Sequence, residues 1–279
     1  MTPPQTGRDN PDRQRMIPGF IGWGEQNQAV WRALKAGGVA NPRFLTGGEP
    51  TPTPEGMVPT AQVEKFFAGA QAIFLDVPLP RLAALLPTVR LAISDQHLIA
   101  VTGKKMALAD LLDHLIERKV MRCLIHPAQD VKEDIVVFHP SVFVSPGDIT
   151  GFRELFHTSG VVLSIDTEPQ FDVVRTLAAL TPALVYTLAD ALADGGLMLG
   201  LPREKGLTVL RAVLNMAADR LYRKQEPPSV LREAALLDED ASAGLMELEA
   251  SGLRGELMRV VGHGARIKGK PGTPPVKNR

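Results

Sequence analysis

The sequence predicts a two-part fold, an α/β domain followed by an all-helical domain, and two observations support this prediction. Short apolar runs alternate with helical stretches up to about Asp166, and such strands pair in parallel through crossover helices. From Thr167 to Arg266 the chain is rich in Ala and Leu and contains no convincing strand. Proline-rich ends predict disordered tails at residues 1–16 and 267–279. The expected domains are therefore residues 17–166 and 167–266.

The individual elements are expected where apolar runs are bounded by turn residues. Strands are expected at residues 19–22, 43–46, 72–77, 91–94, 120–125 and 161–165, with helices at 26–36 and 108–118. The prolines between Pro42 and Pro59 predict a long loop, because proline cannot continue a helix or donate to a sheet ladder. In the second domain we expect helices at residues 171–199, 203–223, 228–237 and 242–266.

The composition argues against several classes of protein. The 31 basic and 31 acidic side chains give a net charge of +0, which argues against a nucleic-acid-binding protein. Cys123 is the single cysteine, which excludes an internal disulfide and favours a reducing compartment. The most apolar stretch, residues 177–189, contains Pro182 and is shorter than the roughly 20 residues of a membrane-crossing helix. We therefore expect a soluble, cytoplasmic protein with no membrane partner.

The strongest local motif is a glycine-rich turn between the first strand and the first helix. It reads Gly19-Phe20-Ile21-Gly22-Trp23-Gly24. In Rossmann-type domains such glycines let the pyrophosphate of a dinucleotide approach the backbone at the helix N-terminus. Asn27 stands at the third position of this pattern, where Gly or Ala is usual, so a turn without a ligand stays an alternative. The expected cofactor-binding residues of this turn are Gly22, Trp23, Gly24, Glu25 and Gln26.

The end of the second strand bears on the choice between NADP and NAD. Thr46 and Gly47 follow this strand, and Thr46 is a candidate contact for a phosphate. No acid ends the strand to bind a ribose 2′-hydroxyl, and no Arg follows at once to hold a 2′-phosphate. The missing acid leans weakly towards NADP, and NAD stays open.

The helical part carries motifs that resemble the pyrroline-5-carboxylate reductase family. Residues 189–204 are similar to the family pattern E-A-L-A-D-A-G-V-x-M-G-L-P-R-E, and residues 248–255 to L-E-x-G-G-F-R. Together with the glycine turn, the resemblance covers roughly residues 17–266. It implies a Rossmann-type dinucleotide-binding domain, an all-helical dimerisation domain and a homodimer through the C-terminal helices, with higher oligomers left open. It also implies NAD(P)-dependent imine reduction in proline biosynthesis, with Val77 and Pro78 beside the cofactor.

The chain departs from the family pattern at the positions that bind substrate. Of the family's S-G-S-G segment, only Thr181 keeps a hydroxyl. The carboxylate-binding loop S-P-G-G-T-T corresponds to residues 237–242, which contain three consecutive acids. The resemblance places Thr181, Asp240 and Ser242 at the substrate, and the acids predict poor binding of an anionic imino acid. The acidic run is alternatively a solvated loop or a helix cap.

Two polar residues at expected strand ends are further candidates. His126 precedes Pro127 where α/β domains place their ligand crevice, so His126 and Thr181 are the candidate catalytic residues. A surface histidine beside a turn is the alternative for His126. Asp76 is either a pocket acid or a strand-end residue that satisfies loop amides. The histidines show no pairwise ligand spacing, so no metal site is expected.

Two functions follow from these observations. The first is an NAD(P)-dependent reductase of the pyrroline-5-carboxylate reductase type, acting on a C=N or C=O bond of a small substrate other than pyrroline-5-carboxylate. The alternative is a non-catalytic relative that keeps the dimer as a binding or scaffolding module. Gly22 and Gly24 favour the enzyme, whereas Asn27 and the acidic run favour the alternative.

Overall fold

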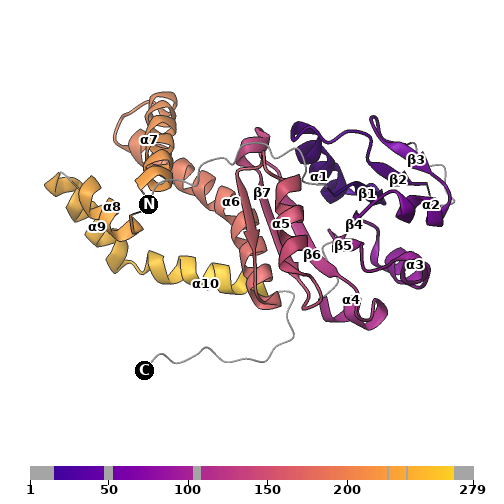
Figure 1. Cartoon of the computed structure of the whole chain (residues 1–279). Coiled ribbons are helices and arrows are strands. Elements are labelled where there is room, and N and C mark those ends of the chain that lie inside the picture. Colours follow the sequence, from indigo (N-terminus) through magenta and orange to yellow (C-terminus); the bar gives the residue numbers. More distant parts are fainter. Residues whose placement is uncertain (1–15, 47–52, 103–107, 225, 237, 267–279) are drawn as a thin grey trace, which may run out of the picture. The chain divides into compact units, whose positions relative to one another are not determined.

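The computed structural model describes residues 16–46, 53–102, 108–224, 226–236 and 238–266. The chain divides into two compact units, Met1–Phe171 and Asp172–Arg279 (Figure 1). The tails expected at residues 1–16 and 267–279 lie outside the described residues, apart from Met16.

The first unit is built on one eight-stranded sheet of order β3-β2-β1-β4-β5-β6-β7-β8. The strands are β1 (Pro18–Ile21), β2 (Arg43–Leu45), β3 (Val58–Thr60), β4 (Ala72–Leu75), β5 (Leu98–Val101), β6 (Val120–His126), β7 (Ile135–Pro140) and β8 (Val161–Ser164). All pairs from β3 to β6 are parallel, whereas β7 runs antiparallel to β6. The order of the first six strands is that of a Rossmann fold, which confirms the predicted fold class.

Helices cover both faces of this sheet, because its central strands are apolar on both sides. They are α1 (Glu25–Ala36), α2 (Val63–Ala68), α3 (Leu79–Ala92), α4 (Leu108–His114) and α5 (Pro146–Leu155), with a short 3-10 helix at Val131–Glu133. In β4, Phe74 packs into a core with residues of α1 and α5. Its neighbours Ile73 and Leu75 pack into a second core with residues of α2, α3 and α4. The carboxyl ends of β1, β4 and β5 consequently meet at one edge.

Two expectations for this unit were wrong, and one strand was missed. Residues 91–94 are not a strand, because Leu86, Val89 and Ile93 recur at helical spacing and bury the end of α3, and the strand is β5. The proline-rich segment is not all loop, since Pro59 lies in β3 at the sheet edge, where the missing donor is tolerated. The antiparallel strand β7 was not expected at all.

The second unit consists of helices, as predicted, and contains no strand among its described residues. The helices are α6 (Glu168–Met198), which begins in the first unit, α7 (Arg203–Lys224), α8 (Pro228–Ala235), α9 (Glu239–Ala250) and α10 (Leu253–Arg266). The single helix expected at residues 242–266 is divided between α9 and α10. Gly252 causes the break, because its φ of +81° is a left-handed conformation that favours glycine.

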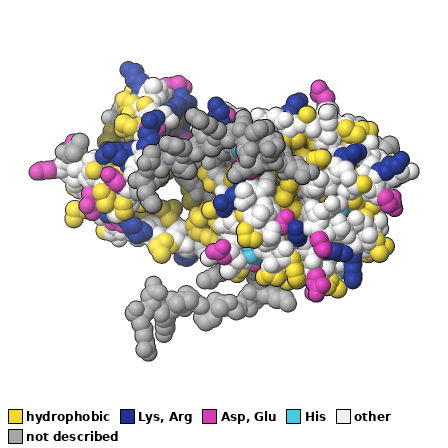
Figure 2. Space-filling model, in the orientation of Figure 1, with side chains coloured by type: hydrophobic (Ala, Val, Ile, Leu, Met, Phe, Trp, Pro, Cys, Tyr) yellow, Lys and Arg dark blue, Asp and Glu magenta, His cyan; other side chains and the backbone are white. Residues whose placement is uncertain are grey.

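The helical unit has almost no interior of its own. Among its described residues only Thr176, Ala193 and Gly206 are buried. Met198 is 87% exposed and Met246 is 73% exposed, and Figure 2 shows apolar side chains at the surface of these helices. By length and composition alone α6 could cross a membrane, a property that core helices of soluble proteins share. The described helices of this unit therefore present an extended apolar surface.

Candidate functional site

The turn between β1 and α1 requires glycine for two reasons. Gly22 has a φ of +80°, and a Cβ at this position would lie 2.9 Å from the carbonyl carbon of Asp76. The strand end of β4 therefore touches the turn directly. Gly24 is the N-cap of α1 in an extended conformation and provides no side-chain cap. The first amides of α1 are consequently left for other side chains, water or a ligand to satisfy.

Asn27 forms a buried hydrogen-bond network beneath this turn. Its Nδ2 donates to the carbonyl oxygens of Gly22 (2.9 Å) and Phe74 (3.2 Å). Its Oδ1 accepts a hydrogen bond from the Thr102 hydroxyl at 3.1 Å. Asn27 is fully buried and joins the ends of β1, β4 and β5. Asn27 is bulkier than the Gly or Ala that is usual at the third position of the glycine pattern, and its hydrogen bonds satisfy the buried polar atoms of its side chain.

Asp76 lies at the start of α1. Its Oδ2 accepts a hydrogen bond from the backbone N–H of Asn27 at 3.0 Å. Its own N–H donates to the carbonyl oxygen of Ile21 at 3.0 Å, which continues the pairing of β4 with β1. Of the two interpretations of this residue, the structure shows the strand-end acid that satisfies an amide, and the amide belongs to α1.

The other residues proposed to bind the cofactor differ in their contacts and in their exposure to solvent. The Trp23 ring packs edge-on against Phe20 and Phe44, each at 6.0 Å between ring centres. Thr46 donates its N–H to Thr60 at 3.1 Å. Glu25 is exposed in the first turn of α1, Val77 is half-buried beside Gly22, and Pro78 is the exposed N-cap of α3. Gly47 lies outside the described residues.

Gln26 is buried, and its side chain is directed into the protein. Its Nε2 donates to the carbonyl oxygen of Ile125 at 3.2 Å, and its Oε1 accepts from the Ile125 N–H at 3.0 Å. β5 pairs with β6 only as far as Arg122. Ile125 lies beyond this pairing, and the side-chain amide of Gln26 provides hydrogen-bond partners for its backbone N–H and carbonyl oxygen. The side chain therefore stabilises the sheet, and only the backbone of Gln26 remains for a ligand.

His126 ends β6 beyond the level where this strand pairs with β5. It is paired with Ile135 in the antiparallel hairpin of β6 and β7 and is half-buried. The loop after it is anchored by Arg32, which donates to the Ala128 carbonyl and to the buried carboxylate of Asp134, each at 2.6 Å. Asp134 also accepts the N–H of Ala128 at 2.7 Å. These contacts hold the loop after His126, and no local sequence pattern marks them, because Arg32 and Asp134 are 102 residues apart.

Two other reactive side chains of this unit are structural. The ring of His139 is buried and its Nδ1 lies 2.8 Å from the carbonyl oxygen of Ile165. Cys123 is buried in β6, and burial raises the pKa of its thiol to about 12. Within the described parts of the chain, no three His, Cys, Asp or Glu side chains gather as a metal site.

The proposed substrate residues belong to the helical unit. Thr181 is exposed on α6. Asp240 lies in the first turn of α9, and Ser242 donates from Oγ to the Asp238 carbonyl oxygen at 2.9 Å. Asp238 is the N-cap of α9, with Oδ1 accepting the N–H groups of Asp240 (2.7 Å) and Ala241 (3.3 Å). The acidic run is thus a helix cap, one of the two interpretations of its sequence, and Asp followed by acids is a recognisable cap signal.

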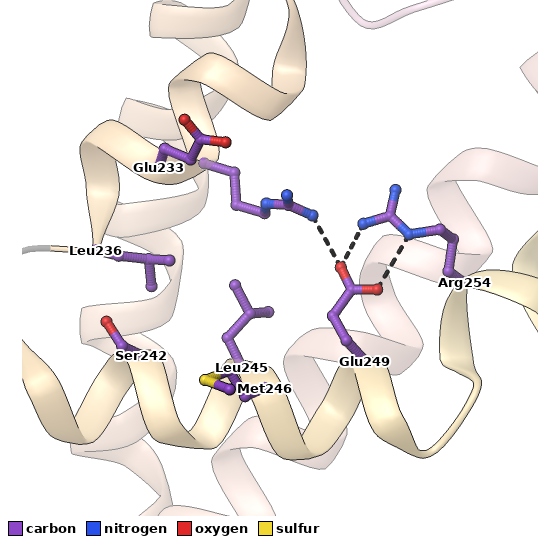
Figure 3. A pocket seen from close by; sticks show the side chains of 8 residues that line it. Glu233, Leu236, Ser242, Leu245, Met246, Glu249 and Arg254 are labelled. Atoms are coloured by element: carbon purple, nitrogen blue, oxygen red, sulfur yellow. Dashed lines mark hydrogen bonds and ion pairs between the residues drawn. The ribbon is translucent and has the colours of Figure 1, made fainter.

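Ser242 also lines a cleft of about 540 Å³ within the helical unit (Figure 3). Leu236, Leu245 and Met246 provide apolar lining. At one side Arg232 donates to Glu249 at 2.8 Å, and Arg254 donates to both oxygens of the same carboxylate. The hydrogen bonds from Arg254 hold the pKa of Glu249 below its ordinary value. Arg232, Arg254 and Glu249 are therefore paired with each other, and Glu233 adds a further carboxylate to the lining.

Comparison with known proteins gives a consistent resemblance. Residues 168–269 match the family model for pyrroline-5-carboxylate reductase dimerisation. The chain is 25% identical to a pyrroline-5-carboxylate reductase of Arabidopsis thaliana over 251 residues, covering 87% of this chain and 91% of the relative. It is 24% identical to the human pyrroline-5-carboxylate reductase 2 over 259 residues, covering 88% of this chain and 81% of the relative.

Solved structures show the same fold. A pyrroline-5-carboxylate reductase from Coxiella burnetii superposes with a TM-score of 0.78 at 15% identity, covering 91% of this chain and 97% of the other. The NADP-bound pyrroline carboxylate reductase of Plasmodium falciparum gives a TM-score of 0.72 at 17% identity, with the same shares covered. From its glycine turn to its last described helix, this chain therefore resembles the pyrroline-5-carboxylate reductase family in sequence and in fold.

Proposed function

We propose that this chain is an NAD(P)-dependent oxidoreductase of the pyrroline-5-carboxylate reductase type that reduces a C=N or C=O bond of a small substrate. The observation that carries the proposal is the turn of Gly22 and Gly24 between β1 and α1, at the head of a Rossmann-ordered sheet. The resemblance over most of the chain supports the same reaction class. We expect NADP to be preferred over NAD and the protein to act in the cytoplasm.

The backbone of the turn offers a dinucleotide the amides of α1 without a side-chain cap, with the Asp76 carboxylate beside Gly24. In this proposal the pyrophosphate binds at Gly22 and Gly24, Thr46 contacts the adenosine side, and Val77 and Pro78 contact the nicotinamide side. When bound, the cofactor supplies the hydride. The carboxylate of Asp76, which accepts the Asn27 N–H, does not fit an anion at this position, and the exposed Glu25 adds a second acid to the first turn of α1.

The chain's own part in the reaction is to orient the substrate and supply a proton. His126 is proposed as the proton donor and Thr181 as a hydroxyl that holds the substrate. The match of residues 168–269 to a dimerisation domain supports a homodimer through α6 to α10. A dimer also explains why these helices expose apolar side chains in the monomer.

We further propose that pyrroline-5-carboxylate itself is a poor substrate. The carboxylate of Asp238 already accepts the first amides of α9, and Glu239 and Asp240 add negative charge beside it. An anionic substrate placed there loses those donors, and each lost charge-assisted hydrogen bond costs roughly 1.5 to 3 kcal/mol. Two such losses lower catalytic efficiency about 10² to 10⁴-fold. A neutral or cationic imine, or a carbonyl compound, should be preferred.

The test is a steady-state assay with NADPH and NADH against a panel of cyclic imines and keto acids. We expect turnover of at least one imine or carbonyl compound, and kcat/KM for pyrroline-5-carboxylate at the low end of the panel. Efficient reduction of pyrroline-5-carboxylate would refute the substrate part of the proposal and place the protein in proline biosynthesis. Absence of binding of both cofactors would favour a non-catalytic dimer instead.

A variant of the α9 cap isolates the substrate claim. Asp238→Ser keeps a capping hydroxyl and removes the carboxylate, so kcat/KM for carboxylate-bearing imines should rise about tenfold while that for neutral imines stays unchanged. Asp219→Asn, an exposed acid on α7 that pairs with Arg223, is the matched control and should change neither value. An equal effect of Asp238→Ser on both substrate types would contradict the assignment.

A further inference from the structure

The amides at the start of α1 are the donors that a pyrophosphate would use. Gly24, the N-cap, has no side chain with which to cap them. One of these donors, the N–H of Asn27, is already taken by Asp76 Oδ2 at 3.0 Å. A carboxylate and a phosphate compete for the same backbone N–H donors at a helix N-terminus, because both are anions that accept hydrogen bonds. Asp76 is therefore a competitor for this donor within the chain.

The space beside Gly24 leads to the same conclusion. A Cβ built on Gly24 would overlap the Asp76 carboxylate, with its Oδ1 at 2.6 Å. The carboxylate therefore packs against the bare backbone of Gly24, on the side that the glycine leaves open. A phosphate in this space would meet a negative charge at van der Waals distance.

The backbone of Asp76 is fixed by the sheet, whereas its side chain is held at the turn by the hydrogen bond from Asn27. Its backbone N–H is held by Ile21 at 3.0 Å, next to the pairing of Leu75 with Ile21. The side chain has two free torsions and is half-buried, so it can rotate out of the turn without disturbing β4. Anion binding at the turn thus requires a side-chain movement and the loss of one hydrogen bond.

We infer that Asp76 acts as an internal anion that competes with the cofactor pyrophosphate at the start of α1 and thereby sets a weak affinity for the dinucleotide. The inference rests on the proposed function, since it concerns the same cofactor site. It assigns to Asp76 the role of a residue that limits the affinity of this turn for an anionic ligand. Neutralising this one side chain should strengthen dinucleotide binding.

The experiment measures NADPH and NADH binding to the full-length protein by calorimetry, for the wild type and three variants. Asp76→Asn keeps the shape and an oxygen acceptor but removes the charge, Asp76→Ala clears the space, and Asp76→Glu keeps the charge. We expect Kd to fall at least tenfold for Asp76→Asn and Asp76→Ala, equivalent to 1.4 kcal/mol, and not for Asp76→Glu. Asp95→Asn, an acid with a 90% exposed side chain that pairs with Arg118, is the control and should leave Kd unchanged.

A second measurement separates this role from a purely structural one. Thermal unfolding should show that Asp76→Ala lowers the melting temperature, because α1 loses a cap, while added NADPH raises it more than in the wild type. Inorganic pyrophosphate should compete with NADPH more strongly in Asp76→Asn than in the wild type. A structural residue alone would lower the melting temperature without any gain in ligand stabilisation.

The possible outcomes distinguish this inference from the proposed function. If the wild type binds NADPH and the neutral variants bind it no more tightly, the competition is refuted and the proposed function stands. If only the neutral variants bind, the competition is established and the wild type is not a working dinucleotide enzyme. If neither the wild type nor the neutral variants bind, both proposals are overturned.

Discussion

Single residues around the glycine turn have distinct structural roles. Gly22 is required by its left-handed backbone and by the nearby strand end of β4, whereas Gly24 is extended and can accept a side chain if Asp76 moves. Asn27 holds three strand ends together through its amide. These neighbouring positions therefore respond differently to substitution.

The two glycines give the first prediction. Gly24→Val should abolish dinucleotide binding and leave the domain folded, because valine suits an extended backbone but fills the space of the pyrophosphate. Gly22→Val should prevent folding, since its φ of +80° is unfavourable for a branched side chain. Binding of NADPH and far-UV circular dichroism distinguish the two variants. Dinucleotide binding by Gly24→Val at wild-type affinity would show that the turn is not the cofactor site.

The second prediction concerns the buried amide of Asn27. Asn27→Ala should lower the free energy of unfolding by about 2 to 4 kcal/mol, since it leaves a cavity and unpaired buried carbonyl groups. Gln28→Ala, the exposed neighbour whose amide donates to Trp23, should cost less than about 0.5 kcal/mol. Denaturant unfolding measures both values. Equal losses for the two variants would contradict the importance of the network.

The third prediction concerns Cys123. Its thiol is buried and its pKa is raised to about 12 by that burial, so it should stay protonated and unreactive in the folded protein at pH 8. A colourimetric thiol reagent should show no reaction in buffer and one thiol per chain in denaturant. Rapid reaction of the folded protein would mean that β6 opens locally.

At the scale of elements, caps decide where several helices begin, and α5 is the clearest case. Ser145 and Asp148 form a reciprocal capping box, in which the Asp148 N–H donates to Ser145 Oγ at 3.2 Å and the Ser145 N–H donates to Asp148 Oδ2 at 2.9 Å. Partial burial raises the pKa of Asp148, but the hydrogen bonds from Ser145 and the nearby Lys119 ammonium outweigh it and lower the pKa below its ordinary value of 3.8.

The fourth prediction follows from that lowered pKa. A carboxyl whose pKa is lower in the folded state stabilises the fold above its unfolded pKa, and this contribution is lost as the pH falls through the folded value. Asp148→Asn should therefore lower the free energy of unfolding by about 1 kcal/mol at pH 7, and the difference should disappear as the pH falls below 3.8. Urea unfolding across this range is the measurement, with Asp95→Asn as control. A difference that persists at low pH would contradict the assignment.

At the scale of the whole molecule, the two units differ in how they bury apolar surface. The first encloses two cores on either face of its sheet. The second leaves large side chains such as Leu192, Met216 and Met258 at least half exposed, and a helical domain of this kind needs an external cover.

The fifth prediction is that this cover is a second copy of the chain. Sedimentation equilibrium should show a dimer at micromolar concentration, and Leu192→Arg on α6 should weaken it because it places a charge in an apolar contact. Gln28→Arg, on the exposed face of α1 in the first unit, is the control and should leave the dimer intact. A stable monomer, or partitioning of the chain into lipid vesicles, would show that another surface covers these helices.

Hydrophobic periodicity and the positions of Gly and Pro in the sequence were sufficient to predict the α/β and helical parts and the strand-turn-helix with its glycines. They also predicted the helices from Glu168 onwards, except for the division between α9 and α10. These features depend on local conformation, which neighbouring residues determine. The strand β5, the antiparallel strand β7 and the engagement of the site residues were decided by contacts between distant segments. Gln26 and Ile125 are 99 residues apart, and Asp76 and Asn27 are 49 residues apart. A sequence pattern identifies Asp76 as a strand-end acid, but only the packing of β4 against β1 brings its carboxylate to the first turn of α1, because the helix offers unsatisfied amides there.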